Sequence, residues 1–600
     1  MSAKIHFDLT SLRRAYADGT LTPVQVVEEV LRRADDLKFP HVWIEKLGRE
    51  QLLALAKALP PKPTPELPLY GVPFAIKDNI DLTGIKTTVG CPAFAYAPEK
   101  SASVVAKIIA AGALPIGKTN LDQFATGLVG TRSPFGICQS VFDAKYISGG
   151  SSSGSAVAVA SGMVTFALGT DTAGSGRVPA AFNNIVGLKP TKGLLSTSGV
   201  FPACRSLDCV SIFAGSCHDA QAILNVAAGF DATDAYPRSR PKTAPTIPAN
   251  FKFGILPPTQ REFFGDAEAA ELYEQAIGQL RAVGGEAVEF DYAPFAQAAA
   301  LLYAGPWVAE RRWALGDFFE KHGDTMHPVV REIIGNAKKY DAVATFDAQY
   351  KLQALAQIVA PVWDKVDVLL LPTAGTTYRI EELLSEPIKF NSNLGYYTNF
   401  VNLLDLSALA LPAGFRKTNG LPFGITLIGR AFADEALLQL GAKFHQAIGG
   451  QIGVTKNAIA AQPVPTAKAN NILLAVVGAH LRGQPLNHQL TSRLAEFIRQ
   501  TRTAPCYRLF ALANTQPPKP GLKRVAEKLT QGIEVEIWSL DEAAFGSFVA
   551  EIPPPLGIGT LELEDVTSVK GFLCEPIGLD GGRDITEFGG WRAFRASLAK

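Results

Sequence analysis

The sequence lacks the features that mark secreted, membrane-spanning and nucleic-acid-binding proteins. Its seven cysteines in 600 residues include no CxxC pair, which favours reduced thiols over a disulfide framework. No apolar run reaches the ~18 residues of a membrane span, and the first residues lack a signal peptide's apolar core. The 57 basic and 56 acidic residues leave a net charge of +1, so no basic surface points to nucleic acid or a membrane. We expect a soluble, cytoplasmic protein that acts on a small molecule.

Histidine is also scarce, and its distribution restricts the chemistry. The chain has eight histidines, without the spacing of a metal site, and it has no phosphate-binding loop. We therefore expect neither a metal nor an organic cofactor. No histidine occurs from Val42 through Cys217, the span that holds every serine- and glycine-rich loop. A base near those loops must be another residue type, unless a distant histidine folds back onto them.

The length requires more than one domain, because single hydrophobic cores stop growing near ~250 to 300 residues. Helical and strand-like segments alternate up to about residue 448, which indicates one large mixed β-sheet covered by helices. Weak periodicity and prolines at 463 and 465 predict a linker over 449–470. The sequence therefore predicts an α/β domain over 1–448 and a smaller α+β domain over 471–600.

Local patterns place several elements. Thr22 and Gln25 form a capping box around Pro23, which predicts a helix starting there. Residues 102–111 are typical of a helix, and residues 113–117 and the run VDVLLLPTAG are typical of strands. In the last domain, NILLAVVGAH and the alternating residues 533–537 predict two more strands.

Three motifs supply the groups that amide hydrolysis needs: a nucleophile, a base and donors for the oxyanion. They are LYGVPFAIKDNI, which contains Lys77, then GGSSSGS and GTDTAGSGRVPA. Without a local histidine, lysine is the natural base. Its usual pKa of ~10.4 must then be lowered by burial or by neighbouring charge.

In their order and spacing, these motifs resemble the amidase signature family. The resemblance implies that Lys77, Ser151 and Ser175 form the catalytic set, with Ser175 as the nucleophile and a cis peptide bond between Gly150 and Ser151. Lys77 precedes Ser151 by 74 residues, and Ser151 precedes Ser175 by 24. It also implies that the backbone N–H groups of Ser175 and its three predecessors form the oxyanion hole: Thr172, Ala173 and Gly174. Ala173 replaces the family's usual glycine.

Other interpretations exist for each motif taken alone. A lysine at the end of a strand is usually solvated, and serine-glycine runs are usually turns. The run from Gly150 to Gly154 also fits G-x-S-x-G, the nucleophile elbow of α/β-hydrolases, which would make Ser152 the nucleophile. The preceding QSVFDAKYISG is polar and unlike the apolar strand that an elbow requires.

Two further features, one segment of the first domain and the C-terminal domain, resemble the allophanate hydrolases within this family. LLYAGPWVAERRWAL resembles their substrate-binding stretch, which implies that Tyr303 and Arg311 hold the substrate's carboxylate. An arginine can donate two parallel hydrogen bonds to such a group. The C-terminal runs GAHLRGQPLNHQL, APCYRLFAL and PLGIGTLELEDVTSVKGFLCEP resemble their appended domain. The implied substrate is allophanate, or urea-1-carboxylate, which is cleaved to ammonia and carbon dioxide during urea degradation.

The resemblance extends to partners. It implies a homodimer and a metabolic link to the urea carboxylase that makes allophanate. Apart from the resemblance, His480 is a candidate proton donor for a decarboxylation in the C-terminal domain, because a histidine titrates near neutrality. The alternative is a histidine with a structural role only. Three more residues there are candidates for holding an anionic intermediate: Arg482, Tyr507 and Lys570.

Other function classes remain open at this point. One is a general amidase for small carboxylated amides such as malonamate. Another is an amidotransferase subunit that passes ammonia to an acyl-tRNA, which the absence of a basic patch disfavours. The last is a binding or structural protein, against which the joint presence of Lys77, Ser151 and Ser175 argues.

Overall fold

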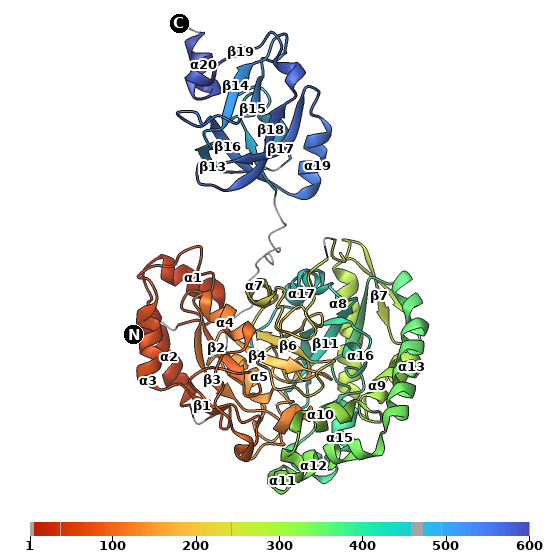
Figure 1. Ribbon diagram of the computed structural model, residues 1–600. Helices are drawn as coiled ribbons and strands as arrows, with labels where there is room; N and C mark the ends of the chain where they lie inside the picture. Colours follow the sequence, from red (N-terminus) through yellow and green to blue (C-terminus); the bar gives the residue numbers. More distant parts are fainter. Residues whose placement is uncertain are drawn as a thin grey trace. The chain divides into compact units, whose positions relative to one another are not determined.

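The chain divides into two units, Met1–Pro465 and Thr466–Lys600, and each has a hydrophobic core of its own (Figure 1). The computed structural model describes residues 5–36, 38–241, 243–455, 457, 472–493 and 495–598. Most of the predicted linker over 449–470 lies outside the described residues. The predicted domain limits, 1–448 and 471–600, therefore stay predictions.

The first unit is built on one mixed sheet of 11 strands in the order β1-β3-β2-β4-β6-β5-β10-β11-β9-β7-β8. Strand β2 runs parallel to β3 and β4, and β7 runs parallel to β8 and β9, whereas the other pairs are antiparallel. The predicted fold class, a large mixed sheet covered by helices, is confirmed. The strands are β1 Trp43–Lys46, β2 Pro73–Lys77, β3 Leu114–Thr119, β4 Phe166–Asp171, β5 Val186–Lys189, β6 Cys209–Ala214, β7 Phe251–Ile255, β8 Gly285–Glu289, β9 Val368–Pro372, β10 Ser407–Phe415 and β11 Pro422–Gly429.

Helices lie around this sheet along its whole length (Figure 1). Helix α2 has the predicted capping box at Thr22 and Gln25. The strand predicted over 113–117 is β3, and the strand predicted in VDVLLLPTAG is β9. The α-helices of the unit are α1 Leu9–Ala17, α2 Pro23–Ala34, α3 Arg49–Ala58, α4 Ser103–Ala110, α5 Ser153–Ala160, α6 Val178–Phe182, α7 Cys217–Ala227, α8 Ala267–Ala282, α9 Ala293–Leu301, α10 Trp307–Leu315, α11 Phe318–His322, α12 Pro328–Gly335, α13 Ala342–Val359, α14 Ile380–Ser385, α15 Lys389–Leu394, α16 Phe400–Leu403 and α17 Asp434–Ile448.

Helix α5 lies inside the unit, and all eight of its residues are buried. It packs against β2 and β4. A Cβ added to Gly154 would lie 2.4 Å from the carbonyl oxygen of Val42 and 2.7 Å from the nitrogen of Asn120. The serine-, glycine- and alanine-rich sequence therefore serves close packing, because larger side chains would separate the helix from the strands.

The second unit holds a five-stranded sheet in the order β13-β16-β12-β18-β17 and a three-stranded sheet in the order β15-β14-β19. The smaller mixed C-terminal fold is thus confirmed, with the predicted strands present as β12 and β16. Its strands are β12 Ile472–Val476, β13 Glu496–Arg502, β14 Tyr507–Ala511, β15 Pro520–Arg524, β16 Glu534–Leu540, β17 Leu556–Glu562, β18 Ser568–Cys574 and β19 Arg583–Asp584, and its α-helices are α18 His488–Thr491, α19 Glu542–Ala550 and α20 Trp591–Ser597.

Within the described ranges, no helix combines the length and the apolar character needed to cross a membrane.

A substitution at Gly187 in β5 can test how tightly the sheet packs against the loop that carries Ser175. A Cβ at Gly187 would lie 2.2 Å from the carbonyl oxygen of Gly176 and 2.6 Å from the Cβ of Ala180. We expect Gly187→Ala to lower the free energy of unfolding by about 1–3 kcal/mol through overpacking, measured by urea titration and circular dichroism.

Gly278 in α8 provides the matched control. It is exposed, and its Cβ would meet no atom within 4 Å. Gly278→Ala should raise the free energy of unfolding by about 0.5–1 kcal/mol, because alanine favours a helix. Equal effects at the two positions would contradict the packing argument.

Candidate active site

Lys77 ends strand β2, and its amine lies between two hydroxyl groups. Its Nζ is 2.7 Å from Ser151 Oγ and 2.7 Å from Thr170 Oγ1. Asn79 also donates to Thr170 Oγ1, at 3.4 Å. Strands β2 and β4 run parallel and adjacent, so Lys77 and Thr170 meet at the same edge of the sheet. The structure therefore brings the predicted base to the predicted middle serine.

Burial changes the chemistry of this lysine. The Lys77 side chain is fully buried, and loss of hydration lowers the pKa of its amine to about 7. The buried carboxylates of Asp122, Asp208 and Asp171 oppose this shift, whereas the charge of Arg311 adds to it. At neutral pH a large fraction of Lys77 is therefore uncharged, as a base must be.

The predicted cis peptide bond between Gly150 and Ser151 is confirmed. Asp122 lies against this bond: its N–H donates to the carbonyl oxygen of Ser151 at 3.1 Å, and a Cβ on Gly150 would lie 2.2 Å from its Oδ2. The carboxylate itself accepts from the backbone N–H groups of Val129, Gly130 and Arg132. Asp122 therefore links the Ser151 turn to the loop over 122–132.

Ser175 lies in the loop between β4 and α6 and is buried. Its hydroxyl donates to the carbonyl oxygen of Gly127 at 3.4 Å. Among the described residues, no hydrogen bond joins the hydroxyls of Ser151 and Ser175. Transfer of a proton from Ser175 to Ser151 therefore requires the Ser175 hydroxyl to turn away from Gly127.

The backbone before Ser175 presents a row of unused donors. In the part of the chain that the structure describes, no acceptor takes the N–H groups of residues 172–175, whereas the next one, at Gly176, donates to Asp171. Gly174 has a φ of +145°, which favours glycine. Ala173 has no positive φ, so the alanine that replaces the family's glycine causes no backbone strain. Such a row can stabilise an oxyanion.

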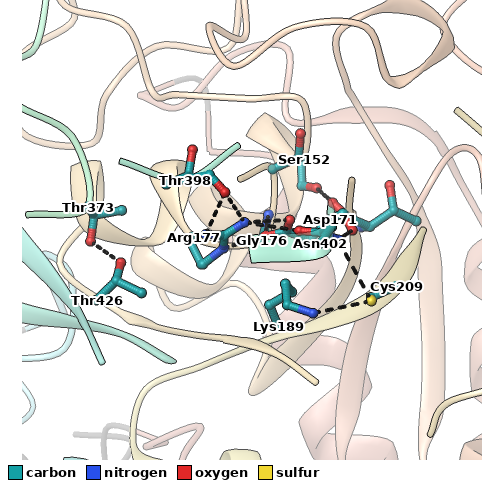
Figure 2. Close-up of polar contacts among 12 residues, drawn as sticks. Ser152, Asp171, Gly176, Arg177, Lys189, Cys209, Thr373, Thr398, Asn402 and Thr426 are labelled. Atoms are coloured by element: carbon teal, nitrogen blue, oxygen red, sulfur yellow. Dashed lines mark hydrogen bonds and ion pairs between the residues drawn. The ribbon is translucent and has the colours of Figure 1, made fainter. Parts of the chain in front are cut away.

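A buried ion pair holds this loop in place (Figure 2). Arg177 donates to both oxygens of Asp171 at 2.9 Å, and also to the carbonyl oxygen of Thr398 at 3.2 Å. Asn402 donates to the carbonyl oxygen of Asp171 at 2.7 Å. Because both ends of the loop are bonded to buried groups, its backbone donors keep a defined direction.

Asp208 supports the same loop from another side. It accepts from the hydroxyl of Thr172 and from the backbone N–H groups of Ala203 and Cys204. Burial raises the pKa of its carboxyl to about 6. Sequence reasoning missed Asp208, Asp122 and Thr170. Only Thr170 carried a local signal, because it belongs to the GTDTAGSGRVPA motif.

Ser152, the alternative nucleophile, is bonded to the backbone. Its Oγ donates to the carbonyl oxygen of Thr170 at 3.2 Å. Residues 148–151 form no strand, although helix α5 follows at Ser153. The strand that precedes a nucleophile elbow is therefore missing from the described residues before Ser152.

Arg311 and Tyr303, the two residues predicted to hold a carboxylate, lie close together. Arg311 in α10 is buried, and its Cζ is 5.5 Å from the centre of the Tyr303 ring. Its Nη1 donates to the carbonyl oxygen of Ala125 at 3.2 Å and to Thr126 Oγ1 at 3.1 Å. Its Nη2 has no partner among the described residues. A buried donor without a partner is costly, so this nitrogen is suited to an anionic ligand.

His480 lines a pocket in the second unit, with a volume of ≈ 60 Å³. Its ring stacks on Phe572 and contacts Phe548 edge-on, and its Nε2 lies 2.8 Å from Gln489 Oε1. Burial lowers the pKa of His480, which favours the neutral ring over the protonated form of the predicted proton donor. Lys519 also lines the pocket, whereas the three other candidates do not: Arg482, Tyr507 and Lys570.

Among the described residues, no group of three or more histidine, cysteine, aspartate or glutamate side chains is arranged to hold a metal ion.

Both units resemble known families. The family model described as Amidase matches residues 25–438, and the model described as Allophanate hydrolase C-terminal domain matches residues 472–596. The solved structure of a Kluyveromyces lactis allophanate hydrolase has a TM-score of 0.74 and 42% identity, and the match covers 98% of this chain and 99% of that one.

Two curated relatives place these matches in longer and shorter proteins. A urea amidolyase of Saccharomyces cerevisiae is 44% identical over 595 residues, which cover 96% of this chain but 32% of the relative. This chain thus spans under a third of that protein's length. A glutamyl-tRNA(Gln) amidotransferase subunit of Symbiobacterium thermophilum is 33% identical over 476 residues, which cover 72% of this chain and 95% of the relative.

The lowered pKa of Lys77 predicts the pH dependence of amide cleavage. The rate should rise as the pH rises through about 7, because Lys77 accepts a proton only when neutral. Asp208→Asn removes a carboxylate that favours the protonated amine, so this limb of the pH–rate profile should move to lower pH.

Lys77→Met should reduce kcat by about 10²- to 10⁴-fold, as expected for loss of a general base.

Ammonia release at different pH values measures these effects. Asp219→Asn is the control, because Asp219 is also a buried carboxyl with a raised pKa but does not act on Lys77. A limb that moves equally in both variants, or in neither, would remove Lys77 as its source.

Proposed function

Because the chain belongs to the amidase family and carries an allophanate hydrolase C-terminal domain, we propose that it hydrolyses allophanate during urea degradation. One observation carries the proposal: the Lys77–Ser151 contact and the Ser175 loop share a site with a buried arginine that retains an unpartnered nitrogen. The first part suits attack on an amide. The second suits an amide that also bears a carboxylate.

The proposed reaction begins with proton transfer along the three residues. Neutral Lys77 accepts the proton of Ser151, which accepts that of Ser175 as its oxygen attacks the carbonyl carbon bearing the terminal NH₂ group. The tetrahedral intermediate carries a negative oxygen. The backbone N–H groups of residues 172–175 stabilise that charge.

Collapse of the intermediate releases ammonia and leaves an acyl-enzyme. The proton on Lys77 returns through Ser151 to the departing nitrogen. Water then attacks the Ser175 ester by the same relay. The product, an N-carboxylated carbamate, loses carbon dioxide to give carbamate, which yields the second ammonia and a second carbon dioxide.

Arg311 and Tyr303 hold the substrate's carboxylate in this proposal. The free Nη2 of Arg311 donates to one carboxylate oxygen, and the ion pair forms in a site with little water. The remote contact orients the scissile carbonyl over Ser175. A neutral amide makes the same contacts at Ser175 but lacks this anchor.

The similarity to urea amidolyases supports a metabolic link to a urea carboxylase, the class of enzyme that supplies allophanate. We propose a homodimer and a cytoplasmic location as parts of the same function. The seven free cysteines support a reducing compartment.

A second reaction in the C-terminal unit is supported by the His480 pocket. We propose that an anionic product of Ser175 catalysis binds there and loses carbon dioxide. Lys519 supplies positive charge, and the carboxylate of Glu551, which also lines the pocket, is paired with Arg493. Since the pKa of His480 is lowered, its neutral ring would hold the substrate or accept a hydrogen bond more readily than supply a proton.

The carboxylate anchor can be tested with a matched pair of amides. Arg311→Ala should reduce kcat/KM for allophanate and malonamate by about 100-fold or more, because a buried charge loses its partner. Well above pH 7, where Lys77 is neutral with or without the charge of Arg311, the rate with propionamide, in which a methyl group replaces malonamate's carboxylate, should change little. Ammonia release with purified protein measures all three.

Arg312→Ala is the control for this test. Arg312 lies on the same helix but pairs with Glu320 at the surface. Equal losses with charged and neutral amides would remove the anchor role. Rapid turnover of malonamate without turnover of allophanate would instead favour the general amidase. Transfer of ammonia to an acyl-tRNA with partner subunits would favour the amidotransferase.

The C-terminal proposal predicts separable effects. His480→Phe should leave the release of the first ammonia unchanged, because Ser175 lies in the other unit. It should slow the appearance of carbon dioxide, followed by mass spectrometry after rapid mixing. Unchanged carbon dioxide kinetics would leave His480 a structural residue.

A further inference from the structure

Two buried arginines meet at one residue, Thr126, beside the proposed active site. Arg311 Nη1 donates to its Oγ1 at 3.1 Å, and Arg132 Nη1 donates to its carbonyl oxygen at 3.0 Å. Arg132 also donates to the carbonyl oxygen of Pro387 at 2.8 Å. Both guanidinium groups are almost completely buried, so neither can exchange these contacts freely for water.

The hydroxyl of Thr126 is used in both directions. It donates to the carbonyl oxygen of Phe124 at 3.1 Å while it accepts from Arg311. The hydroxyl proton of Thr126 is thereby directed away from Arg311, and a lone pair of Thr126 Oγ1 is directed toward Arg311. With the carbonyl oxygen of Ala125 as the second acceptor, Arg311 Nη1 is held at two points and Nη2 stays without a partner among the described residues.

The backbone around Thr126 is in turn rigidly held. Phe124 and Ala125 have φ values of 52° and 51°, a region that side chains other than glycine rarely adopt. Asp122 bonds to three N–H groups of the same loop. The carbonyl oxygen of Gly127, the residue after Thr126, accepts a hydrogen bond from the hydroxyl of Ser175. Three successive carbonyls thus contact Arg311, Arg132 and the nucleophile.

We propose that Thr126 is a specificity-determining positioning residue, which orients Arg311 so that Nη2 faces the carboxylate of an anionic amide. Arg132 fixes Thr126 from the opposite side. The inference rests on the proposed function only in requiring an amide that bears a carboxylate. It adds that selectivity for this charge depends on a neutral hydroxyl that does not touch the substrate.

An arginine side chain has many rotamers, and holding one of them costs conformational entropy. A buried guanidinium held at Nη1 by two acceptors has little freedom left, so its free nitrogen is already directed when the carboxylate arrives. Without Oγ1, the guanidinium can rotate about its remaining contact, and the substrate must supply the ordering.

The test compares Thr126→Val, which has the same shape but no acceptor, with Thr126→Ser, which keeps the hydroxyl. For malonamate and allophanate, Thr126→Val should raise KM by at least about 10-fold and by no more than about 100-fold. The upper limit is the loss of a hydrogen bond to a charged group, because only the part of that free energy that orients Arg311 appears in KM. The value of kcat should stay within about threefold. Thr126→Ser should restore the wild-type KM, and propionamide turnover should change little in either variant.

Two further measurements separate positioning from a general disturbance. The rate at which the neutral reagent phenylmethanesulfonyl fluoride inactivates Ser175 should be the same in wild type and Thr126→Val. In an Arg311→Ala background, Thr126→Val should have no additional effect on KM, since residues that act through one contact are not additive.

The possible failures are distinct. If Thr126→Val lowers turnover of charged and neutral amides equally, or slows inactivation, the residue only maintains the loop and the inference is wrong. An additive effect with Arg311→Ala overturns it as well. If wild type cleaves malonamate but not allophanate, the proposed substrate fails, while the comparison of malonamate with propionamide still tests Thr126.

Discussion

The burial of one amine governs the chemistry of the first unit. Lys77 lies between Ser151 and Thr170 without access to water, and desolvation brings its pKa to about 7. If the same lysine were solvated, its pKa would lie near ~10.4 and it would be almost fully protonated at neutral pH. The close packing of α5 against β2 and β4 therefore matters to the proposed chemistry, because it excludes water from the amine that we propose as the base.

The loop over 122–132 joins parts of the site that are far apart in the chain. Asp122 touches the Ser151 turn, Gly127 accepts the Ser175 hydroxyl, and Thr126 holds Arg311 from helix α10. A single segment thus sets the distance between Ser175, the proposed nucleophile, and Arg311, the proposed carboxylate-binding group. A fixed distance favours orientation, since a displacement of about 1 Å in this kind of site can cost 10²-fold in rate.

Sequence reasoning could identify candidates where a motif is made of consecutive residues. Lys77, Ser151 and Ser175 each lie in a compact motif, and the cis bond at Ser151 and the mixed sheet were predicted with them. Thr126 and Asp122 were not identified, because their importance comes from contacts with Arg311 and the Ser151 turn. Thr126 accepts a hydrogen bond from a guanidinium group 185 residues away in the chain. Nothing in its neighbouring sequence distinguishes it from any other buried threonine.

The pKa of His480 could not be judged from the sequence either. A histidine in GAHLRGQPLN suggests titration near neutrality, but the enclosing rings of Phe548 and Phe572 come from a later helix and strand. The loss of hydration in this enclosed position moves the pKa downward. Composition and spacing carry no record of such an environment.

The two hydrophobic cores have a consequence for how such a chain evolves. Each proposed site is assembled from described residues of one unit. A shorter amidotransferase subunit matches 72% of this chain, which indicates that the amidase fold persists in proteins of that length. Under the proposed function, the two reactions are modular: a lineage can gain, lose or exchange the second activity by recombination near residue 465. The lifetime of the N-carboxylated carbamate in water limits the value of such a recombination. If this product loses carbon dioxide quickly without a catalyst, a second active site gives no selective advantage.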